Sequence, residues 1–181
     1  GLVGAGGTLI ENGVYNWSNL HTVESGRALA IGFISTEVTN ITIASTATVI
    51  LEDNAVFKES VVDVAGKLVL TADTVDSFSS VTLDRGASVE GDGAITLRLD
   101  NLFSATDGQT MQLFELTDGV LDAQLGGTLT LVYEDGRVVK VSDYSFDYST
   151  GVLTFHADIP EPAAAAALLG LLAMALVARR K

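Results

Sequence analysis

Hydrophobic and polar residues alternate along most of the chain between residues 40 and 160, and turn-forming residues separate the short alternating runs. A period of two is typical of β-strands with one buried face, and Val, Ile and Thr, which favour strands, are frequent in these runs. The chain has 18 glycines against 2 prolines, which suits many tight turns. We therefore expect an all-β body with almost no helix before Pro160.

Three alternating segments recur about every twenty residues. Their apolar positions are Ile41, Ile43, Ala47, Val49 and Leu51, then Val62, Val64, Leu68 and Leu70, then Val81, Leu83, Ala87 and Val89. Small turns divide the segments, at residues 44–46, 65–67 and 84–86. This period favours a β-solenoid (β-helix-like) body, in which equivalent strands stack from coil to coil. A β-sandwich or jelly roll is the alternative, because it has a similar density of short strands.

The segment after residue 128 favours terminal antiparallel hairpins. Residues 128–132 and 137–141 flank a turn that ends in Asp-Gly, a strong hairpin signal. Tyr144, Phe146 and Tyr148 then alternate before a turn at 149–151 and a returning run at 152–155. These three aromatic residues share one strand face. They either pack as a hydrophobic plug at the open end of the solenoid or form a platform on which sugar rings stack.

The composition changes at the C-terminus. Two prolines and one acid, at residues 160–162, precede sixteen uncharged residues that are mostly Ala and Leu, and three cations end the chain. Sixteen helical residues span about 24 Å, slightly short of a usual bilayer crossing, and terminal cations favour the cytoplasmic side. We predict a β-rich extracellular domain at residues 1–158 and a tail at 159–181 with a short transmembrane helix that spans transiently. A helix packed on the domain is the alternative.

This tail resembles the PEP-CTERM sorting signal, through its Pro-Glu-Pro tripeptide, its apolar span and its arginine cluster. The resemblance covers residues 159–181 only. It implies an exported protein of a Gram-negative bacterium, often linked to exopolysaccharide, whose tail is recognised and cut by an exosortase at the inner membrane. The sorting signal would then comprise Pro160, Glu161, Pro162, Arg179, Arg180 and Lys181. Residues 1–7 lack an initiating Met and a basic stretch, so we expect a signal peptide or a longer chain before them.

Charge and composition argue against several classes of function. Ten Lys and Arg face 23 Asp and Glu, and a net charge of -13 would repel phosphate backbones, so we expect no nucleic-acid partner. The absence of cysteine removes disulfides, thiolate metal sites and cysteine nucleophiles. His21 and His156 have no metal-ligand spacing, and no nucleophile or phosphate-loop motif occurs. We therefore expect no catalytic residues and no enzymatic activity.

Calcium is the one cofactor that the sequence suggests. Asp84, Glu90 and Asp92 lie around a Gly-rich turn, and calcium prefers oxygen ligands of this kind. The spacing matches neither an EF-hand nor the repeats of calcium-binding β-rolls, so acidic turns solvated by water are the competing interpretation.

Three functions are consistent with these features. A structural protein of the cell surface or extracellular matrix is our first prediction. A carbohydrate-binding or adhesion module would instead line a groove with exposed aromatic residues, Trp17 or the tyrosines at 144 and 148 among them. A polysaccharide-active enzyme would bring two carboxylates together in a cleft.

Overall fold

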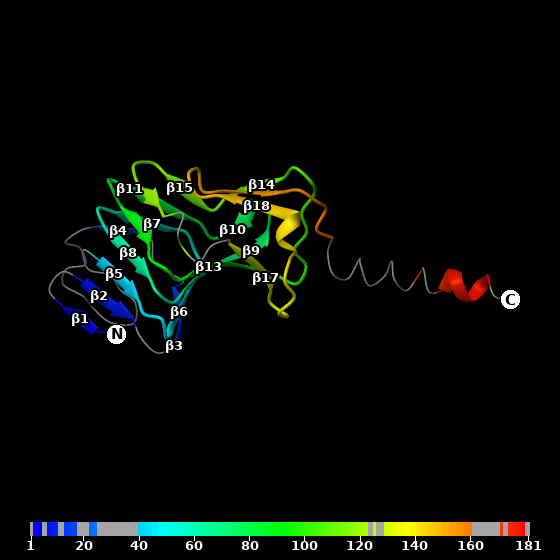
Figure 1. Ribbon diagram of the computed structural model, residues 1–181, viewed down its shortest axis with the longest axis horizontal. Coiled ribbons are helices and arrows are strands. Elements are labelled where there is room, and N and C mark those ends of the chain that lie inside the picture. Colours follow the sequence, from blue (N-terminus) through cyan, green and yellow to red (C-terminus); the bar gives the residue numbers. More distant parts are fainter. Residues whose placement is uncertain are drawn as a thin grey trace.

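The structure is a computed structural model that describes residues 2–4, 7–10, 13–17, 22–24, 40–122, 125, 129–160, 171 and 174–179. Before residue 41 it describes the backbone alone. The described residues form a β body made mainly of parallel sheets, followed by a short stretch of helix near the C-terminus (Figure 1). The all-β prediction is confirmed.

Within the described residues, three sheets run side by side along the body and pair their strands in parallel. The first contains β2 (Gly7–Ile10), β5 (Asn40–Ile43), β8 (Val61–Val64), β12 (Ser88–Glu90) and β16 (Val120–Leu121), with β1 (Leu2–Gly4) antiparallel at its edge. The second contains β3 (Gly13–Trp17), β6 (Ala47–Leu51), β9 (Lys67–Thr74), β13 (Ala94–Leu99) and β17 (Thr130–Tyr133). The third contains β4 (Thr22–Glu24), β7 (Ala55–Lys58), β11 (Val81–Asp84) and β15 (Phe114–Leu116).

The chain visits these sheets in a fixed order, so that β5, β6 and β7 make one pass and β8, β9 and β11 make the next. Equivalent residues therefore pair between passes: Ile41 lies beside Val62, 21 positions later, and Val62 lies beside Val89, 27 positions later. The longer second interval comes from β9, which continues beyond the sheet to pair with β10 (Ser77–Phe78) in an antiparallel hairpin.

The third predicted segment, residues 81–89, is not equivalent to the first two, because it joins a different pair of sheets. Val81 and Leu83 belong to β11 in the third sheet, whereas Val89 belongs to β12 in the first. The turn at residues 84–86 is thus the corner from the third sheet to the first, and the equivalent of the turn at 65–67 is the one that follows β12. The added β9–β10 hairpin displaced the pattern, because it lengthens one pass without interrupting the alternation.

Inward-facing side chains stack into a continuous core. Leu51, Leu70, Leu97 and Leu131 occupy paired positions on neighbouring strands of the second sheet, and all four are 0% exposed. Burying one leucine contributes roughly 1.5–3 kcal/mol relative to leaving it in water. Because the same periodicity places an apolar residue at each equivalent position, the alternation in the sequence is also the alternation between core and surface.

The corner between the first and second sheets requires glycine. A Cβ on Gly66 would overlap the carbonyl oxygens of Ala44 and Ala47, and a Cβ on Gly93, one pass later, would overlap the oxygen of Gly66. Successive passes thus bring their backbones into contact at this corner. Only a residue without a side chain permits that approach.

A fourth, antiparallel sheet lies beside the parallel ones and consists of β14 (Thr110–Gln112), β19 (Val152–Phe155) and β18 (Tyr144–Asp147), which follows the 3-10 helix η1 (Val141–Asp143). The predicted second hairpin is its β18–β19 pair. The predicted first hairpin is much shorter than expected. β17 pairs in parallel with β13, and across its turn the only strand-type pair among the described residues is Val132 with Val138. The returning strand ends early because the chain turns into η1.

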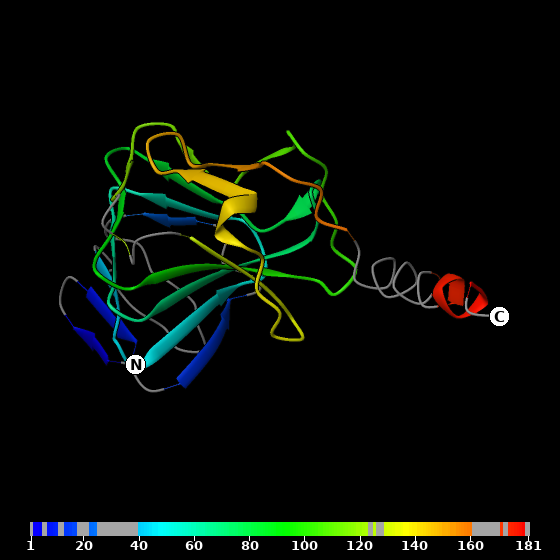
Figure 2. The same cartoon turned by 45° about the vertical axis from the view of Figure 1, so that its right-hand side comes forward.

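The β body ends at Ile159, which is 6% exposed and exchanges two backbone hydrogen bonds with Ala105. Farther on, residues 171 and 174–178 are helical and lie away from the sheets in both views (Figures 1 and 2). Their large apolar side chains are 61–73% exposed, so these residues do not pack on the body. Among the described residues no helix is both long and apolar enough to cross a membrane.

Candidate functional site

The predicted aromatic cluster is largely part of the packing. Tyr144 is 3% exposed and donates a hydrogen bond from its hydroxyl to the Leu129 carbonyl oxygen (2.6 Å). Phe146 and Tyr148 are half-buried against the core, with ring centroids 4.8 Å apart in an edge-to-face arrangement. Burial raises the pKa of Tyr144 and that of Tyr148 above the ordinary value. The packing interpretation therefore fits Tyr144, whereas sugar stacking on Phe146 and Tyr148 stays a prediction. The side chain of Trp17 lies outside the description.

The acids considered for calcium separate into two places. Glu90 and Asp92 line a surface depression of about 470 Å³ together with Asp63 and Asp122, whereas Asp84 lies at a different corner. Asp63 and Glu90 are paired neighbours, and Asp122 follows β16 directly, with its amide bonded to the Val89 oxygen. We name Asp63, Glu90 and Asp122 the acidic row. Within the described residues, no group of three or more acids or histidines has the arrangement of a metal site.

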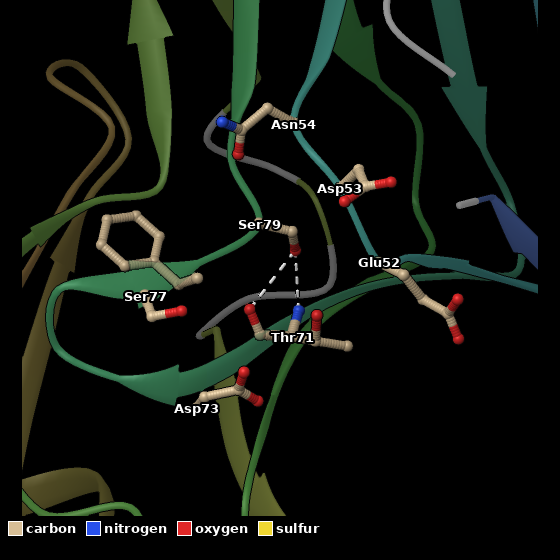
Figure 3. Close-up of a pocket in the computed structure, with 8 residues that line it drawn as sticks. Glu52, Asp53, Asn54, Thr71, Asp73, Ser77 and Ser79 are labelled. Carbon is tan, nitrogen blue, oxygen red and sulfur yellow. Dashed lines mark hydrogen bonds between the residues drawn. The ribbon is translucent and has the colours of Figure 1, made fainter. Parts of the chain in front are cut away.

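A polar pocket of about 310 Å³ lies where β6 ends and the β9–β10 hairpin begins (Figure 3). Its hydrogen bonds hold the corner together: the Ser79 hydroxyl accepts the Thr71 amide (2.8 Å), and the Asn54 side-chain oxygen accepts the Ser80 amide and hydroxyl (3.0 and 3.1 Å). Three carboxylates also line it, those of Glu52, Asp53 and Asp73, and Figure 3 shows them pointing in different directions. That view shows no two carboxylates facing each other as a glycosidase pair does.

His156 has a partner that the sequence did not indicate. Its Nε2 lies 2.7 Å from the Ser145 hydroxyl, because Ser145 on β18 sits beside the end of β19. Both residues are exposed, and the described contacts of the ring include no carboxylate that would orient it as in a hydrolase triad. His21 lies outside the described residues.

A mainly apolar concavity lies on the outer face of the second sheet, and we name it the outer groove. It encloses about 460 Å³ and is lined by Thr48, Ile50, Lys67, Val69, Ala94, Thr96, Arg98, Thr130, Val132, Tyr133, Glu134 and Gly136. These positions form ordered rows across four strands, β6, β9, β13 and β17. Ile50, Val69, Thr96 and Thr130 are successive paired neighbours and make its central row.

Two outward-facing apolar side chains form the floor of the outer groove. Ile50 is 8% exposed and Val69 is 7% exposed, although both point away from the core. Their neighbours along the strands, Val49, Leu51 and Leu70, are the residues that face the core. Lys67 lies on one side of the central row and Arg98 on the other, paired with Val132. In the described part of the chain, the charged groups of Lys67 and Arg98 make no ion pair or hydrogen bond.

A turn held by side-chain contacts borders one end of the outer groove. The Arg137 guanidinium lies 4.5 Å from the centre of the Tyr133 ring and forms a 2.8 Å ion pair with Asp135. The Tyr133 hydroxyl donates to the Phe103 oxygen at 3.2 Å, and burial raises the pKa of Tyr133. Hydrogen bonds from Arg137 lower the pKa of Asp135, led by its backbone amide. These contacts place the turn at the edge of the outer groove.

Sequence reasoning missed this groove, although a signal was present. Val49-Ile50-Leu51 and Leu68-Val69-Leu70 are unbroken apolar triplets inside otherwise alternating strands. The middle residue of such a triplet must face outward. Two outward apolar residues at equivalent positions of neighbouring strands mark a hydrophobic patch on the surface.

The predicted sorting residues are only partly described. Pro160 and Arg179 are exposed, and the Arg179 amide bonds back to the Ala175 oxygen (3.2 Å) at the end of the helical stretch. The other four, Glu161, Pro162, Arg180 and Lys181, lie outside the described residues.

Comparison with known proteins adds no identification. No family model, no curated protein and no solved structure matches this chain. What the chain does must therefore be inferred from its own residues.

Proposed function

We propose that this chain is an exported structural protein of the cell surface or extracellular matrix, with a β-solenoid body and a C-terminal sorting tail. The observation that carries the proposal is the stacking of equivalent strands in register through three parallel sheets around one apolar core. Such a body is stiff, because each pass is fixed by backbone ladders to the passes on both sides. A carbohydrate-binding or adhesion module remains the second proposal.

The exposed tail supports the sorting part of the proposal. Leu171, Met174, Leu176 and Val177 present four large apolar side chains to solvent on a helical stretch that the body does not cover. Apolar surface of this kind is favoured in a membrane or against a partner. Together with the terminal cations, this suits a tail held briefly in the inner membrane, in contact with exosortase-type machinery, before the body is released into exopolysaccharide.

Intact-mass analysis of the full chain recovered from a PEP-CTERM-sorting bacterium tests the proposal. We expect the released protein to lack the residues after about Pro162. A double variant, Pro160→Ala with Pro162→Ala, is expected to keep the tail and stay with the membrane fraction. The matched control is Leu102→Ala, an exposed loop substitution that leaves the tail unchanged.

Two results would overturn the proposal. One is native protein that keeps residues 163–181 and stays in solution without detergent. The other is equal processing of the double variant and the control, because the tripeptide would then have no part in sorting.

A further inference from the structure

We propose that the outer groove binds a short segment of a carboxylated polysaccharide, with Lys67 and Arg98 holding the carboxylates. The inference deepens the proposed association with exopolysaccharide and rests on it. It assigns to the second sheet a binding face that is separate from the cluster of Tyr144, Phe146 and Tyr148.

Charge is the first argument. The chain carries 23 acids against 10 Lys and Arg, so an unpaired cation does not reflect a shortage of carboxylates. Within the described residues Arg137 pairs with Asp135, whereas Lys67, Arg85, Arg98 and Lys140 make no ion pair. Of these four, Lys67 and Arg98 line one concavity. Arg98 is also half-buried, which makes an unpaired guanidinium there less well solvated than one on an open surface. An anionic ligand would supply the missing partner.

The lining between the two cations suits a sugar. The floor formed by Ile50 and Val69 is apolar, and the part of it that stays exposed, 8% of Ile50 and 7% of Val69, can contact the C–H face of a pyranose ring. The hydroxyls of Thr48, Thr96 and Thr130 lie on the same face and can exchange hydrogen bonds with sugar hydroxyls. Four strands at a spacing of about 4.8 Å make the groove about 14 Å wide, the scale of an oligomer rather than of one monosaccharide.

The overall charge limits which anion can bind. A densely charged polymer such as a nucleic acid would meet the acids around the groove, including Glu134 on its rim. Fixed charges are screened beyond about 8 Å at physiological salt, so a carboxylate seated between Lys67 and Arg98 interacts mainly with those two cations. A ligand with one carboxylate per sugar and uncharged hydroxyls elsewhere fits this balance better than a phosphodiester chain.

Amide chemical-shift mapping of the full-length, isotope-labelled chain in mild detergent provides the test. The probe is tetragalacturonate, and its fully methyl-esterified form is the matched neutral probe. We expect the acid form to shift groove amides, among them those of Val69, Thr96 and Arg98, and the ester to bind at least tenfold more weakly.

Charge-neutralising variants locate the carboxylate contacts. Lys67→Gln and Arg98→Gln should each weaken tetragalacturonate binding about tenfold, the loss expected for one charge-assisted hydrogen bond. The controls are Arg85→Gln and Lys140→Gln, which change the net charge equally but lie outside the groove, and they should lose at most about twofold.

Several outcomes would overturn the inference: no binding at millimolar probe, equal binding of acid and ester, equal losses in groove and control variants, or shifts centred on Phe146 and Tyr148. None of these results depends on tail processing. A chain that binds the oligomer but keeps its tail contradicts only the sorting proposal, and a processed chain that does not bind contradicts only the groove.

Discussion

Replacing Gly66 by alanine tests the close packing of successive passes. Gly66 lies at the corner between β8 and β9, where its amide bonds to the Ile43 oxygen (3.0 Å) and its oxygen accepts the Ala94 amide (2.9 Å). It thus connects the pass before it to the pass after it. Its φ is not in the left-handed region, so alanine would have no backbone penalty there, and any effect must come from the added methyl group.

The expected loss follows from what that methyl group meets. It would overlap the carbonyl oxygens of Ala44 and Ala47, which belong to the backbone and cannot rotate away. The corner would have to open, weakening two hydrogen bonds worth about 1 kcal/mol each, with overpacking strain of about 1–3 kcal/mol in addition. We therefore expect Gly66→Ala to lower the free energy of unfolding by about 3 kcal/mol, a large fraction of the total for an ordinary domain.

Urea unfolding followed by circular dichroism measures this loss. With a denaturant slope of about 2–3 kcal/mol per molar, the midpoint should fall by about 1 to 1.5 M. The matched control is Gly86→Ala, where φ is +76° but nothing lies within 4 Å of the added Cβ, so only a left-handed backbone penalty of about 1 kcal/mol applies. If Gly66→Ala loses no more than Gly86→Ala, the close approach of the passes is refuted.

Three further predictions concern the core, the acidic row and one turn. Leu97→Ala removes a fully buried side chain from the leucine stack and should lower the free energy of unfolding by about 2–5 kcal/mol, whereas Leu102→Ala, at 64% exposed, should change it little; urea titration checks both. Glu90→Gln removes one of the like charges of the acidic row. It should stabilise the fold by about 0.5 kcal/mol at low salt and have no effect at 1 M salt. If calcium raises the melting temperature of the unsubstituted chain but not that of Glu90→Gln, the row instead binds an ion. Hydrogen bonds from Ser149, above all from its hydroxyl, lower the pKa of Asp147. The Asp147 carboxylate therefore stabilises the fold above the ordinary carboxyl pKa, and this contribution is lost as the pH falls through the lowered value. Ser149→Ala should raise the pKa of Asp147 in a carboxyl NMR titration, and an unchanged pKa would contradict the assignment.

The strands were predictable because a single physical rule generates both the sequence pattern and the burial. In β8 and β13, alternate residues face the core, so the alternation of Ile95, Leu97 and Leu99 with more polar neighbours could be read directly. The phase of the third segment could not. Its turn at residues 84–86 resembles the turn at 65–67, but the hairpin that separates them is visible only once β9 and β10 are paired.

The candidate site was harder to predict, because it depends on register between distant segments. Lys67 and Arg98 come from different passes, and they reach the same groove only because β9 and β13 pair with Lys67 opposite Ala94. A shift of one residue in that pairing would turn alternate side chains of β13 inward. The sequence shows the apolar triplets, but it does not show that unpaired cations lie beside them.

The two adjacent outer faces also differ in a way that bears on how a polysaccharide would meet this body. The first sheet presents the acidic row of Asp63, Glu90 and Asp122, whereas the second presents an apolar floor with Lys67 and Arg98. We therefore expect the first face to repel an acidic polymer, while the second is the one proposed to bind it. Repulsion contributes to specificity as well as attraction does. Because the sheets are fixed to one another through a shared core, the face that binds would also determine how the body is oriented against the polymer. If the groove binds as proposed, Glu90→Gln should leave the affinity of the groove for tetragalacturonate nearly unchanged. Because this substitution weakens the repulsion by the first sheet, the preference of the oligomer for the second sheet should become smaller. The amide shifts would then spread from β9 and β13 onto β8 and β12.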